Sequence, residues 1–430
     1  MRPNPLRWLL LAGAIHITLT LAIFLVGHFQ LLPNVFDEHG TGLSFAIDGD
    51  SYRNMASQSA TQLQTHGFSV WLAFKVPLHS RLYSLLFATI GRVLGHNVLA
   101  AEPLNLIYYL GILSCVYLLG REIFNERAAM LAAAIVAVWP SFLLHSTQFI
   151  RDTLAISCLL ALLFVLTLVV RRELSVRAAA AFGVVGAAAV TLFWVLRGNM
   201  WNVVVFAIGL TILLLSRRMI RTRKFLLTNS IAIMVVLFAM LVAPSRFEST
   251  ALPGVRPPAT PLAIPSSTQS APMEGVFARV LRQVGQRRAA FGRYNAQESN
   301  IDDDVRLASA GDVVKFTPRA TVIGFFAPFP RMWFQSGSYG SAGRLLSGAE
   351  TLVMYFLYVA AAACVWRNRR RLEMWLLFLV ATMGTIGLGL VVANAGALYR
   401  LRYVFWIMFV IMAAESLVHF TILRTNATKS

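Results

Sequence analysis

The chain has 430 residues, of which 57% are hydrophobic and 13% charged, and its mean hydropathy is +0.65. Soluble globular proteins have about 45–50% apolar and about 25% charged residues, so the composition excludes that class and predicts a membrane protein. The formal net charge is +19, but the basic residues form short clusters between apolar runs, which argues against nucleic-acid binding. The three cysteines lie inside apolar runs and predict neither disulfides nor a metal site.

Apolar runs long enough to cross about 30 Å of hydrocarbon recur along the chain. They predict an all-α polytopic membrane protein with about ten transmembrane helices, at residues 8–28, 104–119, 128–146, 153–170, 178–196, 200–216, 226–243, 349–366, 374–393 and 403–422. The first run has basic flanks and no cleavage site of the A-x-A type, so it predicts a retained signal anchor. The shorter segment Leu82–Leu94 contains Arg92 and predicts a helix in the membrane interface.

The positive-inside rule supports this topology. If Leu82–Leu94 crossed the membrane, the dense basic clusters at 217–224 and 367–371 would lie outside. With that segment in the interface, both termini are cytoplasmic and all eight aspartates face outward. This arrangement predicts a protein of the bacterial inner membrane with its chemistry on the periplasmic face.

The predicted topology divides the chain into three parts: a membrane core at 1–243 with a first outer loop at 29–103, a long outer loop at 244–348, and C-terminal spans at 349–430. The apolar and basic residues of Val276–Tyr294 alternate as in a helix resting on the membrane surface, with its arginines turned away from the lipid. Thr321–Phe334 is rich in Phe, Pro and Trp, which suits the headgroup layer.

The first outer loop has the densest group of carboxylates. Asp37, Asp48 and Asp50 lie there, and a carboxylate partly shielded from water is suited to act as a general base. A solvated acidic loop is the alternative interpretation.

The order of residues around this loop resembles the polytopic GT-C glycosyltransferases that use polyprenyl-phosphate sugars, the superfamily of protein O-mannosyltransferases and aminoarabinose transferases. The resemblance covers residues 8–170. It rests on Asp48-x-x-x-Tyr52-x-x-x-Ala56, on His66-Gly67-Phe68 followed by Lys75-Val76-Pro77-Leu78-His79, on Ile90–Asn97, on Leu119–Ala129, and on Ala137–Phe142.

The chain departs from the family pattern at two positions. The doubled proline is only Val76-Pro77, and the Asp-Glu pair typical of the aminoarabinose branch occurs at Asp37-Glu38. The resemblance therefore implies an aspartate base without deciding between Asp48, Asp37 and Asp50.

The resemblance also implies cations that stabilise the departing lipid phosphate, a task suited to the planar fork of arginine. The outer-face candidates are Arg400 and Arg402 in a Gly-containing turn, together with Arg151 and Arg197. Headgroup contacts, an ion pair of Arg151 with Asp152 and a tight turn at Arg197 are the alternatives. Tyr52, His79 and Lys75 are the candidate substrate-binding residues.

No histidine pair has the spacing of a zinc site, and we expect no obligatory metal, although a divalent cation on Asp37, Asp48 or Asp50 stays open. The resemblance therefore implies an inverting transferase that moves a hexose or pentose from a polyprenyl-phosphate carrier to a lipid, glycan or protein hydroxyl. A polysaccharide polymerase or ligase is one alternative. A lipid-linked-sugar flippase or other transporter is another, and it predicts ionisable residues inside the spans, of which Glu415 is the main example.

Overall fold

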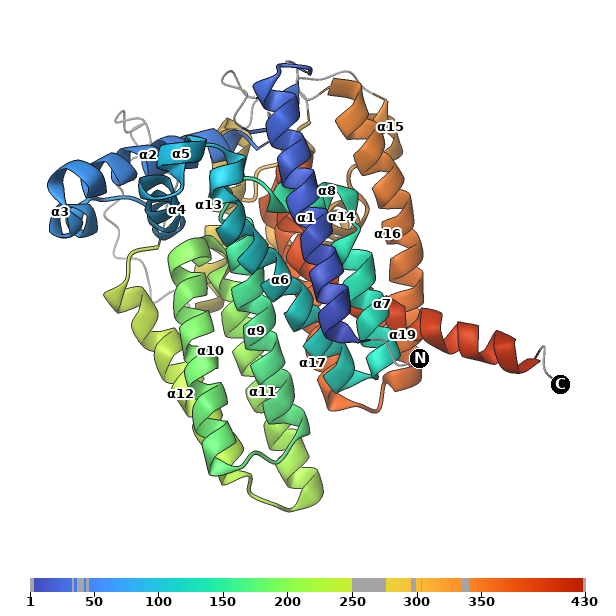
Figure 1. The fold of residues 1–430 in the computed structure, drawn as a ribbon. Helices are drawn as coiled ribbons and strands as arrows, with labels where there is room; N and C mark the ends of the chain where they lie inside the picture. The colour runs from blue at the N-terminus through green and yellow to red at the C-terminus, as the bar shows by residue number, and fades with distance from the viewer. Residues whose placement is uncertain are drawn as a thin grey trace.

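The computed structural model describes residues 4–32, 35–36, 42–43, 46–249, 276–294, 299–302, 304–334 and 340–427, and their regular secondary structure is helical (Figure 1). The long helices are α1 (Pro5–His28), α6 (Val98–Ile123), α7 (Glu126–Ala137), α9 (Asp152–Arg171), α10 (Val176–Arg197), α11 (Trp201–Thr222), α12 (Leu227–Arg246), α16 (Gly340–Asn368), α17 (Leu372–Val391) and α19 (Tyr403–Ala427). The remaining helices are α2 (Ile47–His66), α3 (Phe68–Ala73), α4 (Leu78–Ala88), α5 (Gly91–Leu94), α8 (Pro140–Ser146), η2 (Gly198–Met200), α13 (Val276–Tyr294), α14 (Ala310–Phe326), α15 (Pro330–Trp333) and α18 (Ala395–Leu401).

The predicted all-α membrane fold is confirmed, but the predicted number of spans is not. Among the described residues, eight helical stretches are long and apolar enough to cross a membrane, or nine if α7 and α8, which are bent by 69°, form one span. The segment Leu82–Leu94 is not among them; it forms most of α4 and all of α5.

The count differs from the prediction because the stretch 176–222 contains two predicted spans. It includes both α10 and α11, which are separated only by η2. The two helices fold back on each other, since Arg218 near the end of α11 donates hydrogen bonds to the carbonyls of Val170 and Arg172, just before α10. Trp194 near the end of α10 donates to the carbonyl of Phe247 after α12, so α10 and α12 run in the same direction.

The core is built around α9 and α19, whose middle segments are buried on most sides by the other spans. α14 and α17 pack at very short range because glycines face each other. A methyl group at Gly389 would overlap the carbonyl of Ala320, and one at Gly324 would overlap the carbonyl of Thr385. Small residues allow such close approach of helices in a membrane.

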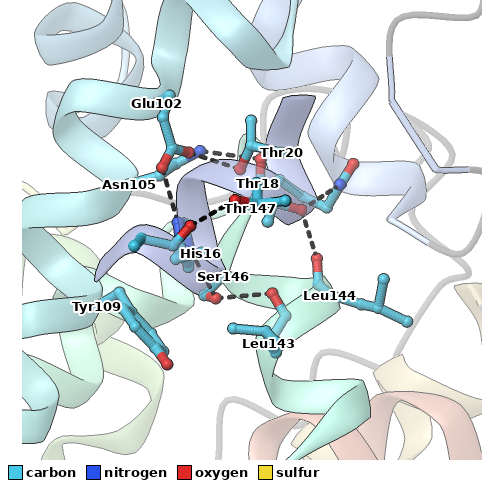
Figure 2. Close-up of polar contacts among 12 residues, drawn as sticks. His16, Thr18, Thr20, Glu102, Asn105, Tyr109, Leu143, Leu144, Ser146 and Thr147 are labelled. Atoms are coloured by element: carbon cyan, nitrogen blue, oxygen red, sulfur yellow. Dashed lines mark hydrogen bonds and ion pairs between the residues drawn. The ribbon is translucent and has the colours of Figure 1, made fainter. Parts of the chain in front are cut away.

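A buried polar network joins α1 to α6 and α8 (Figure 2). The ring of His16 contacts Glu102 through Nδ1 at 2.8 Å and Ser146 through Nε2 at 3.0 Å, and Thr20 donates to the second oxygen of Glu102 at 2.7 Å. Ionisable groups are costly in a membrane unless paired, and here each carboxylate oxygen has a partner. The network holds α1 beside the short helices at the upper end of the bundle in Figure 1.

The predicted helix Val276–Tyr294 is present as α13, but the prediction that its arginines turn outward is wrong for Arg288. Its side chain is 3% exposed, lies over the ring of Phe316, and donates to the carbonyls of Ile301 and Asp302. These carbonyls are among the partners that satisfy the buried guanidinium, and α13 packs on α14 and α17.

Candidate functional site

The motif Asp48-x-x-x-Tyr52-x-x-x-Ala56 forms one face of α2, because residues four apart stack on a helix. Asp48 lies in the first turn, where the helix dipole favours a carboxylate. Tyr52 is 1% exposed and Ala56 is fully buried, and this face packs on α4. The small residue at position 56 is therefore explained by close helix packing, which fixes the direction in which Asp48 points.

Asp48 belongs to a chain of alternating charges at the upper end of the bundle. Arg400 on α18 contacts Asp48 through Nη2 at 2.5 Å, and its Nε lies 3.1 Å from Asp152 at the start of α9. Asp152 also pairs with Arg197 at the end of α10. Asp152 and Arg197 are 7% and 6% exposed, so this pairing is largely shielded from water.

The arginines decide the charge state of Asp48. Burial on its own would raise the pKa of the Asp48 carboxyl, but Arg400, with Arg197 and Arg151 behind it, outweighs burial and holds that pKa below its ordinary value of 3.8. Asp48 is therefore ionised at neutral pH.

Tyr52 on α2 and His79 on α4 extend the site. Their rings meet edge to face at 4.1 Å, and the guanidinium of Arg151 lies 5.9 Å from the centre of the Tyr52 ring. Burial, together with the positive charges of Arg151 and Arg197, holds the pKa of His79 well below its ordinary value, so its ring is neutral. Within the described part of the chain, neither ring nitrogen of His79 nor the hydroxyl of Tyr52 has a hydrogen-bond partner, although all three are buried.

A small cavity opens beside the charges and is apolar over most of its wall. Asp152, Arg197 and Arg400 line its polar end. The rest is formed by side chains of α9, α10, α11, α18 and α19, or of the turn between α10 and α11: Ala155, Ile156, Phe193, Met200, Leu401 and Val404.

The structure thus brings together Asp48, Tyr52, His79, Arg151, Arg197 and Arg400 among the residues predicted from the sequence. Arg402 points elsewhere: it is fully buried and donates to the carbonyls of Gly324 and Phe325. Positions two apart face different sides of a helical turn, so the predicted Arg-x-Arg motif places only one guanidinium in the site.

Three other predicted residues are not seen in the cluster. Asp50 is bound by Arg53 at 2.7 Å and by Asn54 at 3.1 Å, and its side chain is 41% exposed. Lys75 is exposed between α3 and α4. Asp37 lies outside the described residues.

Sequence reasoning did not place Asp152 in the site. It also missed Glu350, a buried carboxylate of α16 that accepts a hydrogen bond from the hydroxyl of Tyr399. The signal was present, since a charge at the start of an apolar run marks a residue that must find a partner. Among the residues that the structure describes, no group of three or more His, Cys, Asp or Glu side chains has the arrangement of a metal site.

Comparisons with known proteins found partial similarities. Residues 79–242 match the family described as dolichyl-phosphate-mannose-protein mannosyltransferase. The chain is similar to the apo oligosaccharyltransferase of Archaeoglobus fulgidus, with 13% identity and a TM-score of 0.48 over 98% of this chain and 52% of that one. It is also similar to AglB of the same organism in complex with an inhibitory peptide and a dolichol-phosphate, with 13% identity and a TM-score of 0.47 over the same shares. The chain therefore spans about half the length of these structures, and no curated protein matches it.

The family match covers residues 79–242 and overlaps the stretch 8–170 on which the resemblance to the GT-C glycosyltransferases rests, so the two agree. The eight or nine candidate spans of the described residues are those of a polytopic membrane protein.

Proposed function

We propose that this chain moves a sugar from a polyprenyl-phosphate carrier to an acceptor hydroxyl, on the outer face of a bacterial inner membrane. Asp48 is the general base of this reaction. Arg400, Arg197 and Arg151 bind the phosphate, and Tyr52 and His79 contact the sugar or acceptor.

One observation carries the proposal. Asp48 and Arg400 are 352 residues apart in the chain and form an ion pair at 2.5 Å, and Arg400 also lines a cavity with an apolar wall. This pairing supports the proposal, because it joins a candidate base and a candidate phosphate ligand in one site.

The cations of the cluster support a phosphate ligand. Arg197 and Arg400 pair with Asp152, Arg400 also pairs with Asp48, and Arg151 lies over the ring of Tyr52. Guanidinium groups are suited to bind the negative charge of a phosphodiester. The apolar wall formed by α9, α10 and α19 suits the first prenyl units of the carrier.

In the proposed reaction, Asp48 accepts the proton of the acceptor hydroxyl while the hydroxyl oxygen forms a bond to the anomeric carbon. The bond from that carbon to the phosphate oxygen breaks, and the electron pair leaves with the polyprenyl phosphate. The arginines stabilise the additional negative charge of the phosphate. Attack from the side opposite the phosphate inverts the configuration of the sugar.

The test is transfer from a panel of radiolabelled polyprenyl-phosphate sugars in membranes that contain equal amounts of each variant. We expect Asp48→Asn to lower the rate by at least about a hundredfold, the effect of losing a general base. Asp50→Asn is the matched control, because Asp50 is an exposed aspartate on the same helix. Equal rates in Asp48→Asn and wild type would refute Asp48 as the base.

The same assay separates the alternatives. Transfer of whole glycans that survives Asp48→Asn would favour a polymerase or ligase, and no transfer from any donor would favour a transporter. Glu415, the ionisable residue that suggested transport, is paired with Arg367 at 2.6 Å, which gives it a role in holding α19 to α16.

A further inference from the structure

A second buried carboxylate lies near the proposed site without belonging to its ion pairs. Glu350 on α16 is 5% exposed and accepts hydrogen bonds from the backbone N–H and the hydroxyl of Ser141 and from the hydroxyl of Tyr399. Among the residues that the structure describes, no Lys, Arg or His forms an ion pair with it. A buried carboxylate with only neutral donors is costly, so its bonds must hold something in place.

These bonds join three elements that are distant in sequence. Ser141 is the second residue of α8, where free backbone N–H groups favour a carboxylate. Tyr399 lies on α18, and the hydroxyl of Tyr403, at the start of α19, donates to the hydroxyl of Ser141 at 2.7 Å. Glu350 therefore ties α16 to α8 and to the junction between α18 and α19.

That junction carries Arg400. Tyr399 and Arg400 are consecutive, so they project from different sides of the short helix α18: Tyr399 reaches Glu350, and Arg400 reaches Asp48 and Asp152.

The rest of α18 is also anchored. Its N-cap, Asn394, donates to the hydroxyl of Ser299 at 3.0 Å, and the N–H of Ala395 donates to the carbonyl of Ser299 at 2.8 Å. Just after the helix, Arg402 donates to two backbone carbonyls of α14. Between these anchors, the hydrogen bond from Tyr399 to Glu350 joins the helix to α16.

We propose that Glu350 is a positioning residue for Arg400: through the hydroxyl of Tyr399 it sets the rotation of α18, so that the guanidinium faces the site that binds the carrier phosphate. This inference rests on the proposed function. It predicts that loss of Glu350 weakens binding of the phosphate group and leaves binding of the prenyl chain unchanged.

The experiment measures binding of two probes to the full-length protein in nanodiscs: a polyprenyl phosphate and the polyprenol of the same length. Tyr399→Phe removes only the hydroxyl that reaches Glu350, and Glu350→Gln keeps the shape of the side chain. We expect each to weaken phosphate binding by about tenfold and to leave polyprenol binding unchanged. Thr351→Val is the control, because Thr351 is buried beside Glu350 and bonds only within its own helix, to the carbonyl of Ser347.

A double-mutant cycle distinguishes positioning from general damage to the fold. If Tyr399→Phe acts through Arg400, it has no further effect on phosphate binding in an Arg400→Ala background. Additive losses, or equal losses for the phosphate and the polyprenol, would overturn the positioning role.

Two outcomes separate this inference from the proposed function. A wild-type protein that binds both probes equally overturns the phosphate site, and the positioning role with it. Phosphate preference that is lost in Arg400→Ala but kept in Tyr399→Phe and Glu350→Gln overturns the positioning role alone.

Discussion

Substitution of Arg400 is the most direct test of the proposed mechanism. Its guanidinium uses two edges, Nη2 toward Asp48 at 2.5 Å and Nε toward Asp152 at 3.1 Å. Arg400→Ala therefore removes the cation from two carboxylates at once and leaves Arg197 as the nearest partner of Asp152. Both the proposed phosphate ligand and the environment of the proposed base change.

The expected loss of rate follows from these contacts. Removing one preorganised group that stabilises charge in the transition state costs about 2.7–4 kcal/mol, or about 100–1,000-fold in kcat. Arg400→Lys keeps the charge but not the planar fork, so it cannot face Asp48 and Asp152 with two separate edges. We expect it to recover part of the lost rate, to within about tenfold of wild type.

The assay is the initial rate of transfer from the radiolabelled donor, at protein levels matched by immunoblot. Arg306→Ala is the control, because Arg306 is an exposed arginine between α13 and α14. If Arg400→Ala stays within about threefold of Arg306→Ala, the proposed role of Arg400 in transition-state stabilisation is refuted.

Two further predictions concern the charge of the base and the packing of the spans. Because Arg400 holds the pKa of Asp48 below 3.8, Asp48 stays ionised as the pH falls from neutral toward that value. We expect the acidic limb of the pH–rate profile to move to higher pH in Arg400→Ala. An acidic limb that does not move would contradict the pairing. Gly389→Ala forces α14 and α17 apart and is expected to destabilise the fold by about 1–3 kcal/mol. Gly387→Ala is the control and is expected to be neutral, because a methyl group there meets no neighbouring atom within 4 Å. Thermal unfolding in detergent compares the two variants, and equal melting temperatures would contradict the packing argument.

The sequence predicted the class of fold because the hydropathy of a span and the basic clusters at its ends are both visible within one short stretch of sequence. The same reasoning assigned Asp48, Arg151, Arg197 and Arg400 to one side of the membrane, and the structure brings them into one cluster. The sequence separated the runs 178–196 and 200–216 at the turn that the structure has as η2, and it took 128–146 as one span, where α7 and α8 are bent by 69°.

The partners of each charged residue could not be predicted in the same way. Asp152 follows Arg151 directly, which suggested an ion pair between neighbours, yet it pairs with Arg197 and Arg400, which come from distant helices. Glu102 lies just before the predicted run 104–119, and Glu350 is the second residue of the predicted run 349–366. Both are buried inside the fold, where only the packing of other helices supplies their partners.

The ion pair between Asp48 and Arg400 also implies an order of events in the proposed reaction. While Arg400 is bound to Asp48, the carboxylate is held in a weakly basic state. A carrier phosphate that binds Arg400 competes with Asp48 for the guanidinium, so it weakens the interaction that lowers the pKa of that carboxyl. Asp48 then becomes a stronger base when the donor is bound. This coupling favours activation of an acceptor hydroxyl only beside a loaded carrier.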